Sequence, residues 1–175
     1  MELKQVLAEG KSKAFAVKLA MTASNDQKLF NELAKLACSN HLGALRASWV
    51  LSFACEFAPE LLLPIEASLL KNLDQGFHTG ITRNLLRIFT VIPVSESNQA
   101  TMFNEASRIF IDRRFPVAVK ANALLICMQL AAKYPDLGNE VWAMAESILP
   151  EHGPALNATA RKAFKQLKKA KKRKA

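Results

Sequence analysis

A short pattern of residues recurs in this chain at an interval of 37 positions. The segment HLGALR at residues 41–46 returns as HTGITR at residues 78–83, and Lys120 stands one further interval after Arg83. Intervals of this length are typical of proteins built from stacked helical repeats. A pair of helices leaves one apolar face open, and a neighbouring pair closes it. The interval therefore predicts a stack of similar helical units.

Two segments are too apolar to lie at a surface. Residues 41–58 contain only two formally charged side chains, Arg46 and Glu56, and are otherwise almost continuously apolar. A helix that is apolar on most sides must be covered on most sides, so we expect this segment to be the central element. Residues 117–133 are more apolar still.

The remaining pattern is also helical. Apolar side chains keep helical spacing, and alternation at every second position is almost absent. The seven prolines and six glycines fall between apolar blocks, where they end helices. The chain is thus predicted to be all-α, with Ser24 or Asn25 capping the third helix and Thr79 the sixth. The expected helices cover residues 2–9, 12–22, 26–39, 41–58, 59 or 64 to 73, 80–91, 96–111, 117–133, 137–148 and 154 onward.

The paired blocks resemble HEAT-like, armadillo-related α-α repeats over about residues 41–165. The resemblance rests on the 37-residue interval, on a basic residue near the start of each first helix, and on a proline in the turn after it. The sequence departs from the pattern of this repeat family in two ways. The usual Asp before the repeat Arg is missing, and the fourth unit has Asn157 at the basic position. The basic residues are Arg46, Arg83 and Lys120, and the prolines are Pro59, Pro93 and Pro135.

This resemblance implies a right-handed α-α superhelix of stacked antiparallel helical hairpins. Residues 1–164 would form one helical-repeat domain, in which residues 1–40 cap the N-terminal end and residues 41–164 form the repeats. Residues 165–175 would follow as a basic tail.

Two interpretations of the repeated basic residues remain open. If the repeats stack in parallel, Arg46, Arg83, Arg87 and Lys120 would form a ladder on a concave face that could hold phosphates or an acidic peptide. The resemblance implies instead that they bond turn carbonyls and acidic residues of neighbouring repeats. We favour this structural role, because surface charges are usually solvated or paired locally.

Two other polar groups also allow two interpretations. Ser48, Ser52 and Glu56 form a stripe at four-residue spacing, which would be either the edge of a groove or, as we favour, a solvent-exposed strip without a partner. Arg113 and Arg114 lie in a basic loop beside an aromatic residue. They could contact nucleic acid or a protein, but we favour the interpretation that they neutralise helix C-terminal carbonyls.

The histidines, tryptophans and cysteines are each more easily explained by a structural role than by a role in catalysis or metal binding. His41 and His78 are repeat-equivalent and are expected to cap helices or lie in loops. Trp49 and Trp142 are expected in the core. The cysteines are far apart, form no CxxC pair and are expected to be buried, reduced thiols. They are Cys38, Cys55 and Cys127.

The net charge of +9 comes from one end of the chain. Residues 161–175 hold nine of the 24 basic residues and none of the 15 acidic ones, so the preceding residues are neutral as a whole. Such runs bind phosphate backbones non-specifically, and a solvated end without a partner is an equal alternative. The tail residues predicted to bind are Lys168, Lys169, Lys171, Lys172, Arg173 and Lys174.

No motif in the sequence predicts catalysis. GxGxxG, GxxxxGK[ST], GxSxG and HExxH are all missing, so we expect no enzyme, no cofactor and no metal site. No apolar run is long enough to span a bilayer, the N-terminus has no signal-peptide pattern, and we expect a cytoplasmic protein.

We predict a non-catalytic scaffold for protein-protein interaction with an unidentified protein partner. The alternative is nucleic-acid binding through the basic tail and the basic groove residues.

Overall fold

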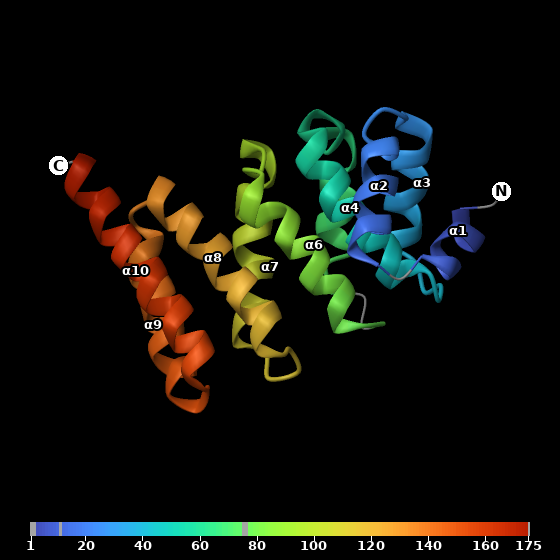
Figure 1. Ribbon diagram of the computed structural model, residues 1–175. Helices are drawn as coiled ribbons and strands as arrows, with labels where there is room; N and C mark the ends of the chain where they lie inside the picture. The colour runs from blue at the N-terminus through green and yellow to red at the C-terminus, as the bar shows by residue number, and fades with distance from the viewer. Residues whose placement is uncertain (1–2, 11, 75–76, 175) are drawn as a thin grey trace. The chain divides into compact units, whose positions relative to one another are not determined.

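The computed structural model describes residues 3–10, 12–74 and 77–174, without the side chains of residues 9 and 166–174 (Figure 1). Within this part the chain forms ten α-helices, four short 3₁₀-helices and no strand, which confirms the predicted all-α class. The α-helices are α1 (Leu3–Glu9), α2 (Lys13–Ala23), α3 (Gln27–Ala37), α4 (Ala44–Phe57), α5 (Glu66–Lys71), α6 (Thr79–Val91), α7 (Gln99–Ile111), α8 (Val117–Lys133), α9 (Leu137–Ile148) and α10 (Pro154–Lys174). The 3₁₀-helices are η1 (Pro59–Leu61), η2 (Leu63–Ile65), η3 (Glu96–Asn98) and η4 (Leu149–Glu151).

The predicted helices agree with the observed ones except after α4. There the expected single helix is broken into η1, η2 and the short α5. Pro59 and Pro64 each lie in the first turn of a 3₁₀-helix. Proline lacks the N–H that a continuous helix needs in its interior, so Pro64 prevents one long helix from forming.

Two of the predicted helix caps are wrong. Asp26 caps α3, because its Oδ1 accepts hydrogen bonds from the backbone N–H groups of Lys28 and Leu29. Ser24 and Asn25 instead donate to the carbonyl oxygen of Met21, each over 2.9 Å, and so terminate α2. At α6 the cap is His78 rather than Thr79, which is already the first helical residue.

The chain divides into two compact units, residues 1–95 and residues 96–175, which are described separately. In the first unit α4 packs against α2, α3 and α6. Its fully buried side chains include Ala47, Leu51 and Ala54. The prediction that the apolar segment at 41–58 would be covered on most sides is therefore confirmed.

In the second unit α8 has the corresponding central place. Helices α7, α9 and α10 all pack against it (Figure 1). Val119, Leu124 and Cys127 of α8 are fully buried. Each unit thus has its own apolar helix at its centre and its own core around that helix.

Candidate functional site

The basic residue near the start of α4 is the first candidate. Arg46 lies in the first turn of this helix, and its Nη1 donates hydrogen bonds to the carbonyl oxygens of Leu7 (2.6 Å) and Ala8 (2.8 Å). These carbonyls belong to the last turn of α1, where a helix has no partners of its own to offer them. Arg46 therefore ties α4 to the end of α1.

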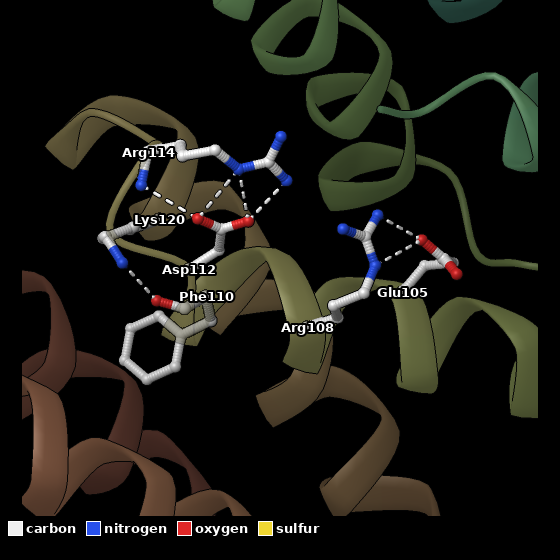
Figure 2. Close-up of polar contacts among 6 residues, drawn as sticks. All are labelled: Glu105, Arg108, Phe110, Asp112, Arg114 and Lys120. Atoms are coloured by element: carbon white, nitrogen blue, oxygen red, sulfur yellow. Dashed lines mark hydrogen bonds and ion pairs between the residues drawn. The ribbon is translucent and has the colours of Figure 1, made fainter. Parts of the chain in front are cut away.

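Lys120 holds the equivalent position in α8. Its Nζ donates to the carbonyl oxygen of Phe110, in the last turn of α7, over 2.6 Å (Figure 2). The side chain is only 1% exposed. Burial lowers the pKa of the ammonium group because desolvation penalises its charged form, while the carboxylates of Asp112 and Glu151 act in the opposite direction. Lys120 is thus a buried donor that joins α8 to α7.

The fourth repeat carries Asn157 at this position. Its Nδ2 donates to the carbonyl oxygens of Leu149 (3.3 Å) and His152 (2.8 Å), which lie just before α10. An amide therefore makes the same kind of bond as the guanidinium of Arg46 and the ammonium of Lys120. The structural role implied by the resemblance is confirmed for these two residues, and the apparent departure at Asn157 preserves it.

A polar seam joins α4 to α6; it consists of Ser48, Ser52 and Glu56 on α4 with Asn84 and Arg87 on α6. Asn84 Nδ2 donates to Ser48 Oγ over 3.0 Å, and Arg87 Nη1 donates to Ser52 Oγ over 3.1 Å. Arg87 Nη2 also pairs with Glu56 Oε1 at 2.5 Å. Both serines are fully buried, so the prediction of a solvent-exposed strip without a partner is wrong.

The seam includes a residue that the sequence analysis missed. Asn84 lies three residues before Arg87, and this helical spacing matches the four-residue spacing of Ser48 and Ser52 on the facing helix. This match in spacing between the two helices is the sequence signal from which Asn84 could have been predicted as part of the seam. Arg87 also stacks over the ring of Phe53 at 4.9 Å, whereas Arg83 is exposed on the same helix.

The basic loop between α7 and α8 is held by carboxylates. Arg114 forms an ion pair with Asp112 at 2.6 Å (Figure 2), and its hydrogen bonds lower the pKa of that carboxyl group. Arg113 pairs with Glu151 at 2.9 Å, with both side chains exposed. Arg113 thus pairs with a side-chain carboxylate rather than with the helix carbonyl that we favoured.

Of the two repeat-equivalent histidines, His78 caps α6, whereas His41 lies in the turn before α4, whose N-cap is Gly43; both therefore fit the expected cap or loop positions. The Nδ1 atoms of His41 and His78 accept hydrogen bonds of 2.9 Å from the backbone N–H groups of Gly43 and Gly80. The pattern shared by residues 41–46 and 78–83 therefore encodes the same turn into a helix at both places.

A model of the HEAT repeat domain matches residues 3–167 of the chain. This match covers almost the whole sequence. The chain belongs to the HEAT repeat family. No curated protein sequence matches it, and no solved structure does.

The tryptophans and cysteines of this HEAT repeat protein differ in burial. Trp142 is 43% exposed, so its predicted place in the core is wrong, while Trp49 is half-buried. Cys55 and Cys127 are buried, free thiols as predicted, and burial raises the pKa of each to about 12. Cys38 is half-buried, and burial raises its pKa to about 11.

The first unit of this HEAT repeat protein has a hollow in its surface. A cavity of about 700 Å³ in the first unit is lined by α1, α3 and the loop after α3, including Lys4, Glu32 and Lys35. Within the described residues, no three His, Cys, Asp or Glu side chains come together as a metal site would require. Among the same residues no single helix is long and apolar enough to cross a membrane, although the bent pair Ala44–Phe57 and Pro59–Lys71 meets that test of length and composition.

The basic tail is described only at its beginning. Arg161, Lys162 and Lys165 are exposed on α10. The backbone of α10 continues to Lys174. The remaining predicted tail residues have side chains outside the described part of the chain; they are Lys168, Lys169, Lys171, Lys172, Arg173 and Lys174.

Proposed function

We propose that this HEAT repeat protein is a non-catalytic scaffold that binds protein partners along an edge formed by successive repeats. The supporting observation is in the first unit. Phe57 and Val91 are the last residues of α4 and α6, and their side chains are 48% and 57% exposed. Large apolar side chains exposed at the C-terminal ends of neighbouring helices are suitable anchors for a protein interface.

The polar seam places these two residues at the same edge. Asn84, near the middle of α6, contacts Ser48, while Arg87 one turn later contacts Ser52 and Glu56. Positions therefore advance along both helices in the same direction, so α4 and α6 are parallel. Their C-terminal ends, which carry Phe57 and Val91, lie at the same edge of the unit.

The polar residues support a binding function rather than a catalytic one. Catalysis needs several polar groups that converge on one pocket. Arg46, Arg87 and Lys120 instead form bonds that hold helices to one another. Asn157 does the same. These bonds occupy three of the side chains that the sequence analysis named as site candidates, Arg46, Arg87 and Lys120.

The test compares partner recovery by two exposed-surface variants. The full chain is used as bait with cross-linking in cell extract, with and without nuclease. We expect a protein to be recovered in a near-equal molar amount after nuclease treatment, and its affinity to fall about tenfold or more for the double variant Phe57→Ser and Val91→Ser. Met21→Ser, which changes another exposed apolar residue of this unit, is the matched control. Recovery that nuclease abolishes, or that the double variant leaves unchanged, would contradict the proposal.

Nucleic-acid binding is the second candidate, and the charge distribution supports it. Residues 161–175 contain nine basic residues and no acidic one, and such a run releases counterions when it binds phosphates. The test measures binding of fluorescent DNA and RNA to the full chain and to residues 1–164 across a salt series. Affinity that falls steeply with salt and is lost on truncation would favour this function; absence of binding in both proteins would exclude it.

A further inference from the structure

An aromatic row lies along α4 and consists of Trp49, Phe53 and Phe57. These residues follow one another at four-residue intervals, a spacing that places side chains on one face of a helix. Trp49 and Phe53 are half-buried, and Phe57 is 48% exposed. The ring centroids of Trp49 and Phe53 are 6.1 Å apart, and the two ring planes are inclined by 53°. The central helix of the first unit is therefore covered on most sides but leaves an aromatic face partly uncovered.

A second row of side chains lies along α6 with the same spacing. It consists of Arg83, Arg87 and Val91, again at four-residue intervals. Arg83 and Val91 are exposed, and Arg87 is half-buried. Because α4 and α6 are parallel and pack against each other, the two rows extend in the same direction.

The guanidinium group of Arg87 joins the two rows into one surface. Its central carbon lies 4.9 Å from the centroid of the Phe53 ring, which is the distance of a cation–π contact. Its Nη2 pairs with Glu56 at 2.5 Å, and its Nη1 donates to Ser52. Arg87 is thus fixed between the helices. We call the surface formed by the two rows the aromatic–arginine face.

The helices that form the aromatic–arginine face have an excess of positive charge. Together α4 and α6 contain three arginines, Arg46, Arg83 and Arg87. They contain one acidic residue, Glu56, which is already paired with Arg87. Arg46 bonds to carbonyl groups, which do not cancel its charge. A guanidinium group binds a carboxylate through two parallel hydrogen bonds, so this face is suited to acidic side chains that lie beside large apolar ones.

We propose that the aromatic–arginine face binds a polypeptide segment that combines acidic and large apolar side chains. The apolar side chains would pack on the aromatic row and Val91, and a carboxylate would pair with Arg83. This inference rests on the proposed scaffold function, since Phe57 and Val91 belong to both surfaces, and it adds the chemistry of the partner. Tryptophan and arginine are the residues that most often anchor protein interfaces, and charge complementarity sets the orientation and specificity of binding.

A polypeptide fits this face better than a nucleic acid does. Bases need open aromatic faces on which to stack, whereas the guanidinium of Arg87 already lies over the Phe53 ring. A phosphate backbone is uniformly negative and would be repelled by Glu56. The two rows also end in Phe57 and Val91, which offer apolar contacts to a side chain but no partner to a phosphate.

The experiment selects peptides from a displayed random library on the immobilised full chain. We expect the enriched peptides to contain both acidic and large apolar residues. The affinity of a synthetic copy should fall about tenfold or more for Arg83→Glu. Replacing the acidic residues of that peptide by the corresponding amides should weaken binding similarly. Lys28→Glu, which reverses an exposed charge on α3, is the matched control and should leave the affinity unchanged.

A second variant tests the aromatic row. Trp49→Ala should lower the affinity of the peptide about tenfold or more. Met21→Ala should leave it unchanged, because this exposed apolar residue lies outside the two rows. Circular dichroism verifies that each variant is helical. If Trp49→Ala does not fold, Arg83→Glu and the amide form of the peptide decide the test.

Three other results would overturn the inference. Enriched peptides that lack acidic residues, or that bind Arg83→Glu as well as the wild-type chain, would contradict the proposed partner chemistry. If such peptides still lost affinity for the double variant Phe57→Ser and Val91→Ser, the scaffold function would stand and this inference alone would be wrong. If a DNA oligonucleotide competed with the peptides and itself required Arg83 and Trp49, the face would be a nucleic-acid site.

Discussion

Lys120 is the residue whose surroundings differ most from those that its side chain prefers. A buried ammonium group loses its hydration, and this cost is tolerated only where bonds and nearby opposite charges offset it. Here the offset comes from the carbonyl oxygen of Phe110 and from the carboxylates of Asp112 and Glu151, while Arg113 acts against it. The residue stabilises the junction of α7 and α8 through one donor and an apolar stem.

Variants of Lys120 separate the contribution of the stem from that of the donor. We expect Lys120→Ala to lower the free energy of unfolding by about 3 kcal/mol, because it leaves both a cavity and an unpaired buried carbonyl. Lys120→Met fills most of the volume and should cost about 1–2 kcal/mol less. Urea unfolding followed by circular dichroism provides the measurement. Equal losses for the two variants would mean that packing around the stem contributes nothing.

The lowered pKa of Lys120 also predicts a dependence on pH. In the alkaline range below the ordinary lysine pKa, the folded protein releases the Lys120 proton while the unfolded chain still holds it. The unfolded state then binds more protons, so stability rises with pH. Relative to Lys120→Met, the wild-type protein should therefore gain stability from neutral pH into this range. The free energy of unfolding of both proteins is measured over a pH series, and taking the difference between them cancels the titration of all other groups. A difference that stays constant with pH would contradict the effect of burial on Lys120.

The sequence predicted these residues only in part. The 37-residue interval identified Arg46 and Lys120 as equivalent, and the structure shows both bonded to carbonyls at the end of a helix. It could not show that Lys120 is fully buried, because burial depends on which helices cover the position. It also marked Asn157 as different, although an amide can donate the same bond.

At the level of helices, Gly80 allows α6 to approach α4 closely. A Cβ atom at this position would lie 2.8 Å from Leu45 Cδ1 and 2.9 Å from Nδ1 of His78, which is fixed by its capping bond. At the repeat-equivalent Gly43 the nearest atom would be 3.3 Å away, on His41. The same residue therefore has different packing roles in the two repeats.

Substituting the two glycines tests this difference. We expect Gly80→Ala to lower the free energy of unfolding by about 1 kcal/mol or more, since the clash exceeds the usual gain from replacing glycine in a helix. Gly43→Ala should change it by no more than about 0.5 kcal/mol. Thermal unfolding of both variants gives the comparison. In a Leu45→Ala background the Gly80 penalty should shrink; an unchanged penalty would assign it to His78 alone.

The polar seam shows how far a pattern on one helix can be interpreted. The spacing of Ser48, Ser52 and Glu56 predicted correctly that they share one face of α4. A single helix cannot reveal which other helix covers that face, so the stripe was assigned to solvent. The structure covers it with α6, where Asn84 and Arg87 form the matching bonds. Asn84 and Arg87 lie 36 and 35 residues after their partners on α4, so a comparison of the polar spacings on neighbouring helices, rather than of positions at the exact 37-residue interval, would have indicated this contact.

At the level of the whole molecule, the two compact units repeat one arrangement. Each has a central apolar helix, α4 or α8, against which three other helices pack. Both helices could be identified from the sequence because they contain so few charges. Where the chain divides could not be predicted, since the 37-residue interval continues across Ser95 and Glu96 without a change in composition.

Equivalent core deletions in the two units should have local effects. Leu51 of α4 and Leu124 of α8 are both fully buried, so replacing either by Ala should cost about 2–5 kcal/mol. In helical-repeat proteins most energetic coupling is between neighbouring repeats. We therefore expect Leu51→Ala to reduce hydrogen-exchange protection mainly in residues 1–95, and Leu124→Ala mainly in residues 96–175. Mass-spectrometric exchange measured on the full chain resolves the two regions. If both variants reduced protection equally along the entire chain, the units would unfold as one, and the separate cores would not correspond to separate cooperative segments.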